Sequence, residues 1–536
     1  MSLFDWNFPY PSQRMPVLAR QAVATSQPLA AQAGLQMLLR GGTAADAAIA
    51  TAAALTVLEP TSNGIGSDAF ALVWWNGKVH GLNASGRAPK ALTLEAVAGR
   101  WPGGIEDPTR PPLGWDFVTV PGCVSGWRAL SQKFGRLPFA DLFEPAIAFA
   151  RDGFLVAPQT AGGWSRAGTR FAAFDEFKRV FLPNGRGPRP GEKVTLPDHA
   201  RTLEEIARTG GDSFYRGALA ARILAAAKAD GAMLREEDLA THRADWVDPI
   251  SIDYRGLTLH EIPPNGQGIA ALSALGMLSH SDFAAMQADC PDCIHTQIEA
   301  MKLAFADAHA FVADSETMTT TSEALLDPAY LQERAATIDP QVAADPGHGQ
   351  PRRGGTVLLT AADRDGMMIS FIQSNYMGFG SGVVVPETGI SLHNRGACFS
   401  FTPGHPNAFG GGKRPYHTII PAFVTRAGAP LMAYGVMGGF MQPQGHLQVL
   451  TRLADFKQNP QAAIDAPRWQ VMSGKKVSIE PGFDPELIEE LRRRGHDLTL
   501  AETRNVSFGG AQAILALEDG YFAASDPRRD GMAVGW

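Results

Sequence analysis

The sequence predicts a soluble globular protein of mixed α/β class, and two observations carry this prediction. Hydrophobic residues make up 45% and charged residues 19% of the 536 residues, a balance typical of a chain that buries a large core. Stretches with the apolar spacing of helices alternate with short apolar runs bounded by glycine and proline, which indicate strands. The length suits one large domain or up to about three ordinary ones.

Helical patterns are frequent before residue 315. Residues 27–40 have helical spacing and stop at a glycine pair, and Thr43 is expected to cap a second, alanine-rich helix at 44–58. Small residues on every side of that second helix indicate close packing against other layers. Further helices are expected at 124–133, 139–152, 197–208, 216–230, 236–241, from 269 onward, and at 294–313, 444–456 and 485–494.

Strand patterns occur in both halves of the chain. Residues 70–84 and 249–262 are expected to form paired strands. Residues 340–355, rich in glycine and proline, predict a mobile linker. After the linker, apolar runs on either side of a turn at Asp365 and Gly366 predict a strand–turn–strand unit. Later strands are expected at 419–425, 431–436 and 511–523.

Charge and cysteine usage argue against several function classes. The net charge of −7 and the pI near 6.0 oppose a general affinity for nucleic acid or anionic membranes. Four cysteines are too few for a disulfide framework. Cys290 and Cys293 have metal or redox spacing with His295 nearby, but zinc would need a second ligand pair, so a surface turn is the preferred interpretation. The sequence predicts no metal and no cofactor.

The sequence also carries no targeting signal that we recognise. The stretch from Met1 to Phe8 lacks a basic start followed by an apolar run, so no secretory signal is expected. No run reaches the roughly 18 apolar residues of a membrane span. A cytoplasmic location is therefore expected.

Common catalytic motifs are missing from the chain. It has no Gly-x-Ser-x-Gly elbow, no His-Glu-x-x-His pair and no Walker loop. The stretch from Gly64 to Ala69 fits a loose dinucleotide fingerprint, but it follows a predicted helix and leads into a strand. A tight glycine turn is the expected structure there.

The stretch from Arg352 to Thr360 offers a different kind of nucleophile. A turn into a buried strand is the simplest interpretation of Gly355 and Thr356. If the peptide bond before Thr356 is cut, however, its hydroxyl becomes a nucleophile and its own α-amine, with a pKa near ~8, becomes the base. Gly355 leaves the scissile carbonyl unhindered, and the linker before it can move away after the cut.

Short motifs along almost the whole chain point to one protein family. In chain order they are Gly41 to Ala48 (GGTAADAA), Val120 to Gly122 (VPG), Glu299 to Asp307 (EAMKLAFAD), Asp363 to Gly366 (DRDG), Phe379 to Gly382 (FGSG), Lys413 to Pro415 (KRP), Gly438 with Gly439, and Asp526 to Gly531 (DPRRDG). With this set the chain resembles the γ-glutamyltransferase (glutathione hydrolase) family of N-terminal-nucleophile hydrolases. Within it, the chain is similar to a branch of glutathione-hydrolase-like and oxamate amidohydrolase-like proteins.

The resemblance implies a four-layer αββα sandwich and a self-processing proenzyme. The family's nucleophilic threonine lies seven residues before the Asp-x-Asp-Gly turn, and counting back from Asp363 gives Thr356. Cleavage between Gly355 and Thr356 would yield a large segment, 1–355, and a small one, 356–536, which together form one domain.

The resemblance also implies roles for individual residues. Thr356 would attack an amide and form an acyl-enzyme, which water or an amine acceptor would release. Gly438 and Gly439 match the family's oxyanion-hole pair, and Ser374 matches a hydroxyl residue that contacts the nucleophile. Thr360 is a second candidate support, although a packed strand threonine is the simpler interpretation. The implied partners are a small-molecule amide, the two segments themselves, and a second processed heterodimer in a homodimer.

The chain departs from the family pattern where the α-amino acid head of a γ-glutamyl donor would bind. The substitutions that line this pocket are Ser85 at the position of the family's arginine, with Arg87 displaced by two residues, Tyr376 for an asparagine, Ala397 and Cys398 for an acidic pair, and His417 and Thr418 for two serines. Losing an ion-pair partner weakens recognition by powers of ten. Amide cleavage is therefore predicted without γ-glutamyl selectivity.

Arg395 stands beside the lost acidic pair and offers a new specificity. It can receive an acidic acyl group that has no amine, and a purely structural ion pair is the equal alternative. The leading hypothesis is thus a threonine amidohydrolase or acyltransferase. The alternatives are a true γ-glutamyltransferase with a rebuilt donor pocket and a non-catalytic binding protein, and the retained Thr356, Gly438 and Gly439 oppose the last of these.

Overall fold

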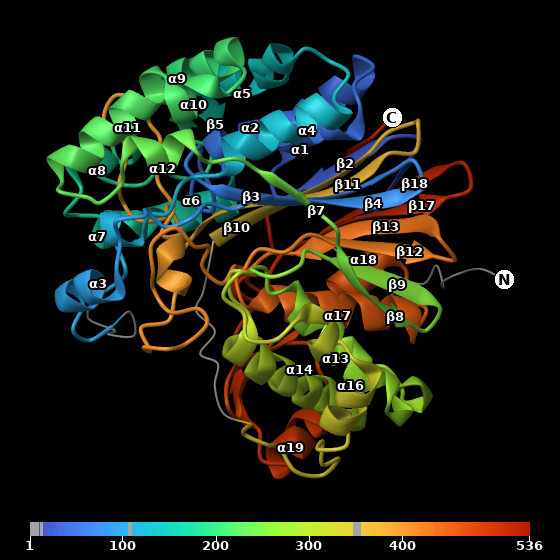
Figure 1. The fold of residues 1–536 in the computed structure, drawn as a ribbon. Helices are drawn as coiled ribbons and strands as arrows, with labels where there is room; N and C mark the ends of the chain where they lie inside the picture. Colours follow the sequence, from blue (N-terminus) through green and yellow to red (C-terminus); the bar gives the residue numbers. More distant parts are fainter. Residues whose placement is uncertain (1–9, 11–13, 105–109, 347–354) are drawn as a thin grey trace.

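Two antiparallel sheets form the centre of the protein (Figure 1). The computed structural model describes residues 10, 14–104, 110–346 and 355–536. The β10 sheet has the order β19 (Met532–Gly535), β2 (Ala22–Thr25), β10 (Gly355–Ala362), β11 (Met368–Tyr376), β3 (Asp68–Trp75), β4 (Lys78–Ala84), β7 (Asp245–Val247). The β13 sheet has the order β1 (Val17–Ala19), β18 (Gly520–Ser525), β17 (Ala511–Leu517), β13 (Ala429–Val436), β12 (Ala422–Arg426), β9 (Leu257–Glu261), β8 (Ile250–Tyr254).

Helices cover the outer face of each sheet, which gives four layers (Figure 1). Over the β10 sheet lie α1 (Pro28–Leu39), α2 (Ala44–Leu58), α4 (Cys123–Phe134), α5 (Glu144–Asp152) and α9 (Pro197–Thr209). Over the β13 sheet lie α13 (Gly268–Ser279), α14 (Pro291–Phe311), α16 (Pro328–Ala335), α17 (Met441–Ala454) and α18 (Pro460–Asp465). The predicted αββα fold is confirmed.

Alternation along β10 divides its side chains between two apolar layers. Val357 and Leu359 pack in the cluster beneath the outer helices, whereas Leu358 packs between the two sheets. Thr356 is two residues before Leu358 and so lies on the same face of β10. Its hydroxyl accepts a hydrogen bond from Gln442 of α17, a helix that covers the β13 sheet. The start of β10 therefore brings the two halves of the molecule together.

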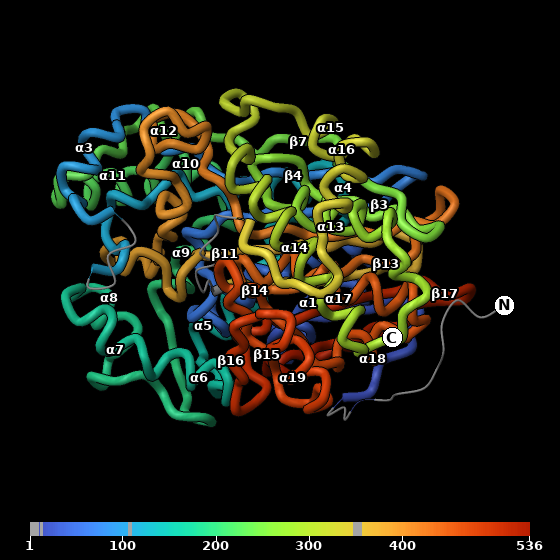
Figure 2. The backbone as a smooth tube through the Cα atoms, turned by 90° about the horizontal axis from the view of Figure 1, so that it is seen from below, coloured from blue at the N-terminus to red at the C-terminus, as the bar shows by residue number. Residues whose placement is uncertain are grey.

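The remaining elements lie around this sandwich. The helices are α3 (Leu94–Arg100), α6 (Pro158–Ser165), α7 (Ala167–Arg170), α8 (Asp175–Phe181), α10 (Asp212–Arg216), α11 (Ala218–Ala229), α12 (Glu236–Ala240), α15 (Ser322–Leu325) and α19 (Pro485–Arg493). The strands are β5 (Phe154–Leu155) with β6 (Lys193–Val194), and β14 (Trp469–Ser473), β15 (Lys476–Ile479) and β16 (Asp497–Leu500). Figure 2 shows β14, β15 and β16 beside α19. Of the helices in the described part of the chain, none has the length and apolar character that crossing a membrane requires.

Several predicted boundaries need correction. The strand expected from residue 419 begins at Ala422, because Pro421 cannot donate a ladder hydrogen bond. The helix expected at 139–152 is a 3-10 turn followed by α5, which starts at Glu144. Strands β1, β2 and β19 and helices α6 to α8 were not predicted from the sequence. Residues 347–354 of the predicted linker lie outside the described residues.

One edge of the sandwich collects loops from the whole chain. In the β10 sheet, β10, β3 and β19 begin at this edge and β2, β11 and β4 end there. In the β13 sheet, β12 and β17 begin at the corresponding edge and β13 and β9 end there. Side chains distant in sequence therefore meet around the start of β10.

Candidate active site at the start of β10

The Thr356 hydroxyl is buried between two polar side chains. Thr356 is 1% exposed, and its Oγ1 donates to Ser374 Oγ at 3.3 Å. Gln442 Nε2 donates to the same Oγ1 at 3.4 Å. Ser374 Oγ also accepts from the backbone N–H of Tyr376 at 2.8 Å. These contacts fix the position of the hydroxyl, and they bring the predicted nucleophile and the predicted supporting serine together.

Gly438 and Gly439 form the turn between β13 and α17. Their φ values are +122° and +64°, a region that favours glycine. A Cβ at Gly438 would lie 3.1 Å from Met441 Cβ and 3.2 Å from Gly509 Cα. Within the described part of the chain, neither glycine N–H donates a hydrogen bond. Two free backbone donors at the positive end of a helix suit an oxyanion.

Two glutamines that the sequence did not identify connect these parts. Gln442 contacts Thr356 and, through its backbone N–H, donates to Gly439 O at 3.1 Å. Gln267 Nε2 donates to Gly439 O at 2.9 Å and to Thr418 O at 2.6 Å. The sequence signal for Gln442 is its place in the first turn of the helix that follows the glycine pair. Gln267 has no comparable signal, since its partners come from a distant part of the chain.

A buried polar cluster surrounds Asp68, the first residue of β3. Its carboxylate oxygens lie 3.1 Å from His417 Nε2, 3.5 Å from His393 Nε2 and 3.9 Å from Arg395 Nε. Each histidine Nδ1 accepts a backbone N–H, from Arg395 and from Ile419, so each Nε2 carries the proton. Burial lowers the pKa of His393 to about 3 and that of His417 well below its usual value. Burial raises the pKa of Asp68 to about 7, although the charge of Arg395 opposes this.

Arg395 is fully buried and incompletely paired. Its Nη1 donates to Thr418 Oγ1 at 2.8 Å, and its guanidinium lies 4.6 Å from the centre of the Tyr376 ring. Its Nε and Nη2 have no hydrogen-bond partner among the described residues, and Asp68 is too distant for a bidentate pair. The structure thus places Tyr376, Arg395, His417 and Thr418 in one cluster.

Ser85, Arg87 and Thr360 have other surroundings. Ser85 Oγ donates to Asn83 Oδ1 at 2.7 Å, and the next N–H, that of Gly86, donates to Asp68 at 3.2 Å, so Ser85 borders the cluster. Arg87 instead binds Asp314 at 2.7 Å and lines a separate cavity of about 350 Å³. Thr360 Oγ1 has no hydrogen-bond partner in the described ranges, Thr356 included.

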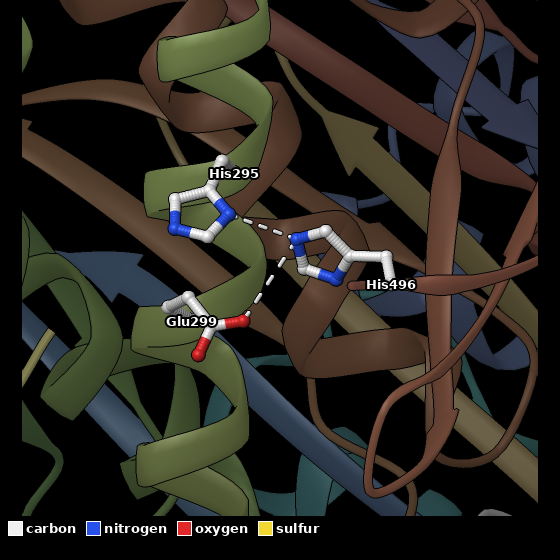
Figure 3. A group of neighbouring side chains, drawn as sticks. All are labelled: His295, Glu299 and His496. Atoms are coloured by element: carbon white, nitrogen blue, oxygen red, sulfur yellow. Dashed lines mark hydrogen bonds and ion pairs between the residues drawn. The ribbon is translucent and has the colours of Figure 1, made fainter. Parts of the chain in front are cut away.

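Cys290 and two histidines make structural contacts at helix α14. Cys290 caps the helix, its Sγ accepting from the N–H of Cys293 at 3.3 Å. His295 Nδ1 lies 2.8 Å from His496 Nε2, with Glu299 beside the pair (Figure 3). These three side chains could hold a metal ion by geometry alone.

Lys302 is the positively charged partner of Glu299 in the cluster of His295, Glu299 and His496. Lys302 Nζ lies 2.7 Å from Glu299 Oε1 and donates to Ala344 O, while Glu299 Oε2 accepts from Ala344 N. His295 Nε2 lies 2.8 Å from the carbonyl oxygen of Asp339. The cluster therefore anchors residues 339–344 to α14, and we name His295, Glu299, Lys302 and His496 the α14 anchor.

Comparison with known proteins identifies the family of this chain. The family described as Gamma-glutamyltranspeptidase matches residues 30–536. The glutathione hydrolase-like YwrD proenzyme of Bacillus subtilis is 35% identical over 96% of this chain and 98% of its own length. The oxamate amidohydrolase proenzyme of Klebsiella pneumoniae is 37% identical over 95% and 97%. The crystal structure of cephalosporin acylase from Bacillus halodurans has a TM-score of 0.93 and 50% identity, covering 100% of this chain and 99% of that chain. The protein therefore belongs to the γ-glutamyltranspeptidase family and is an enzyme of the N-terminal-nucleophile hydrolase type.

Proposed function

We propose that the protein is a self-processing threonine amidohydrolase or acyltransferase whose nucleophile is Thr356. The observation that carries this proposal is the position of the Thr356 hydroxyl, buried against Ser374 and Gln442. Gln442 lies in the first turn of α17, directly after the turn that contains the N–H groups of Gly438 and Gly439, which donate no hydrogen bond within the described residues. A nucleophile and two oxyanion donors are the minimum that acyl transfer requires.

Processing would use the same hydroxyl before the mature site exists. Thr356 Oγ1 attacks the Gly355 carbonyl carbon, the peptide C–N bond breaks, and the acyl group moves to oxygen as an ester. The hydroxyl proton passes to the Thr356 nitrogen, which becomes the free α-amine as the C–N bond breaks. Water then hydrolyses the ester, which releases Gly355 as a carboxylate and restores the Thr356 hydroxyl. Residues 1–355 and 356–536 become separate polypeptides.

Turnover would use the freed amine as the base. The α-amine accepts the hydroxyl proton while Oγ1 attacks the substrate amide, and the N–H groups of Gly438 and Gly439 bind the oxyanion. The proton passes to the leaving amine as the amide C–N bond breaks. Water hydrolyses the resulting ester, or a second amine takes the acyl group.

The acyl group is proposed to carry a carboxylate. Arg395 has its Nε and Nη2 unpaired, and these two nitrogens form the edge that binds a carboxylate in a bidentate manner. The relatives are named oxamate amidohydrolase, cephalosporin acylase and glutathione hydrolase-like protein, names that refer to hydrolase or acylase chemistry on different compounds. Ala397 and Cys398 offer no carboxylate for a donor amine.

Two experiments test the proposal. On a denaturing gel the purified protein should show two bands and the Thr356→Ala variant should show one band, whereas the Thr356→Ser variant should still be cut.

Mass spectrometry after exposure to glutathione, glutaryl-4-nitroanilide and oxamate should then show a carboxylate-bearing acyl group on Thr356 and no γ-glutamyl group. An uncut wild-type chain would refute self-processing, and a γ-glutamyl adduct would favour a true γ-glutamyltransferase.

A further inference from the structure

A β-bulge in β11 lies directly opposite Thr356. The register between β10 and β11 shifts at this point, because two residues of β11 face the single residue Thr356. The shift leaves Tyr376, the last residue of β11, paired with Gly355. On its other side β11 keeps a regular register with β3. The irregularity is therefore confined to the boundary with β10, beside the peptide bond of the proposed cut, and bulges in such places re-aim side chains.

Tyr376 has a backbone conformation that residues other than glycine rarely adopt. Its φ is +71°, and of the described residues other than glycine that have a positive φ, only Tyr376 belongs to a strand. This conformation costs free energy when the side chain is bulky, and it persists only where the surrounding structure fixes it. Strained residues of this kind cluster at functional sites.

Hydrogen bonds hold the chain on both sides of Tyr376. Before it, Asn375 Oδ1 accepts from Ser67 Oγ at 2.7 Å. After it, the N–H of Met377 donates to Asn394 Oδ1 at 3.2 Å. The N–H of Asn394 also donates to the carbonyl oxygen of Asn375 at 3.3 Å, so the two flanks are tied to each other. The φ of Tyr376 therefore cannot become negative unless one of these flanks moves.

The backbone and the ring of Tyr376 contact different parts of the site. Its N–H donates to Ser374 Oγ at 2.8 Å, and Thr356 Oγ1 donates to the same oxygen at 3.3 Å. Because a hydroxyl oxygen has two lone pairs, the donor from Tyr376 limits the direction from which Thr356 can approach Ser374. The ring instead contacts Arg395, whose guanidinium lies 4.6 Å from the ring centre.

We propose that Tyr376 is a positioning residue whose left-handed backbone, and not its ring, holds Ser374 where it orients the Thr356 hydroxyl. This assignment rests on the proposed function, since it names what keeps the nucleophile of that reaction in place. The ring has a separate role, which is to support Arg395 in the acyl pocket. A residue without a ring should therefore preserve the reaction at position 376 if it accepts a positive φ.

Three variants that all lack the ring separate the two roles. Glycine accepts a positive φ freely, asparagine accepts it more readily than most side chains, and the β-branched valine accepts it poorly. Self-cleavage, followed on denaturing gels during cell-free synthesis, should proceed at close to the wild-type rate in Tyr376→Gly and Tyr376→Asn. It should be about 10²-fold slower in Tyr376→Val, the usual effect when reacting groups are misplaced by about 1 Å.

Turnover of glutaryl-4-nitroanilide by the processed enzymes gives a second readout. The kcat should follow the backbone, so that Tyr376→Gly and Tyr376→Asn retain it and Tyr376→Val does not. The KM should rise in all three variants by roughly 3–30-fold, because each loses the cation–π contact with Arg395. This split between kcat and KM is not expected if position 376 only stabilises the fold.

The control is Asn76→Val, which places the same side chain at a positive φ far from the site. Asn76 has φ +50° and lies in the exposed turn between β3 and β4, at the opposite edge of the same sheet. Its replacement should leave the rate of self-cleavage and kcat at their wild-type values even if the stability falls.

The outcomes separate this assignment from the proposed function. Equal cleavage rates in Tyr376→Gly, Tyr376→Asn and Tyr376→Val, whether normal or slow, would overturn the positioning role of the backbone and leave the proposed function standing. If Tyr376→Val shows no cooperative unfolding transition, Tyr376→Ala replaces it and should be cut more slowly than Tyr376→Gly, from which it differs by one methyl group. A wild-type chain that is never cut would refute self-processing, and the positioning role with it.

Discussion

At the scale of single residues, Arg395 is the proposed determinant of acyl specificity. It lies over the ring of Tyr376, whose backbone N–H binds the serine that supports Thr356. The side chain is held by Thr418 on one nitrogen and is free on its Nε and Nη2. Tyr376 therefore connects Arg395 to the serine that contacts Thr356, while the Nε and Nη2 edge of Arg395 makes no hydrogen bond within the described residues.

Replacing Arg395 should affect only acyl groups that bear a carboxylate. Removing one partner of a buried charge pair costs about 2–5 kcal/mol, so Arg395→Gln should lower kcat/KM for such amides by a factor of about 30 or more. Arg395→Lys should recover only part of the loss, because lysine cannot form the bidentate contact. Steady-state rates with a carboxylated and an uncharged acyl donor measure this. An equal loss on both donors would mean that Arg395 is purely structural.

At the scale of elements, the junction of β13 and α17 sets the geometry of the site. The strand ends at Val436, two glycines with positive φ turn the chain, and the first turn of α17 places Gln442 on Thr356. The glycine pair can be recognised from the sequence because it stands between a strand pattern and a helix pattern. The contact of Gln442 with Thr356 cannot be recognised in this way, because it depends on how the two sheets are stacked.

A Cβ at Gly438 should disturb this junction. Alanine would place that atom 3.2 Å from Gly509 Cα and would strain a φ of +122°. Gly438→Ala should therefore lower kcat by about 10²–10³-fold, the usual cost of losing an oxyanion donor. The measurement is kcat in the processed variant. The control is Gly412→Ala, a loop glycine at φ +74° where a Cβ would meet only Lys90 Cγ, at 4.0 Å. A Gly438→Ala enzyme with normal kcat would exclude the oxyanion role.

The α14 anchor makes a second prediction at this scale, about pH. Burial, then the charge of Lys302, lowers the pKa of His496 to about 3, so the folded state excludes a proton that the unfolded chain takes up near pH ~6.5. The contribution of His496 to stability is thus complete above pH ~6.5 and is lost as the pH falls from there toward 3.

His496→Gln should reduce this acid sensitivity. Between pH ~6.5 and ~5.5 the wild type should lose about 1 kcal/mol more unfolding free energy than the variant. Urea unfolding midpoints at the two pH values measure the difference, and His280→Gln, which changes an exposed histidine after α13, is the control. Parallel shifts in wild type and His496→Gln would contradict the assignment.

For the whole molecule, local patterns predicted much of the fold. Thr43 caps α2 through a capping box with Asp46, as its position before an alanine-rich run predicts. The αββα sandwich was implied by the family that the motifs resemble, and so was the role of Thr356, which stays a prediction. Strand β2 was missed because its four residues are all buried and show no alternation. Tyr376, Arg395, His417 and Thr418 were predicted to line one pocket, but Asp68 and His393 were missed, because their contacts with these residues form only when distant parts of the chain come together.

Each of the two proposed segments contributes to both sheets. In the β10 sheet, β2 from residues 1–355 lies between β19 and β10 from residues 356–536. We therefore predict that processed enzyme elutes as one species in size-exclusion chromatography, although a denaturing gel separates its two polypeptides. Elution of separate segments without denaturant would contradict this, and uncut Thr356→Ala supplies the matched reference.

The interleaved order of β2 between β19 and β10 also has a genetic consequence. Because the boundary between the polypeptides is made of backbone ladders inside one core, a polypeptide cannot leave one molecule and join another without global unfolding. Mixing a mature enzyme that is inactivated by a substitution in residues 1–355 with one inactivated by a substitution in residues 356–536 should not restore activity. Two alleles with such defects would therefore fail to complement each other, and every working enzyme would descend from a single intact translation product.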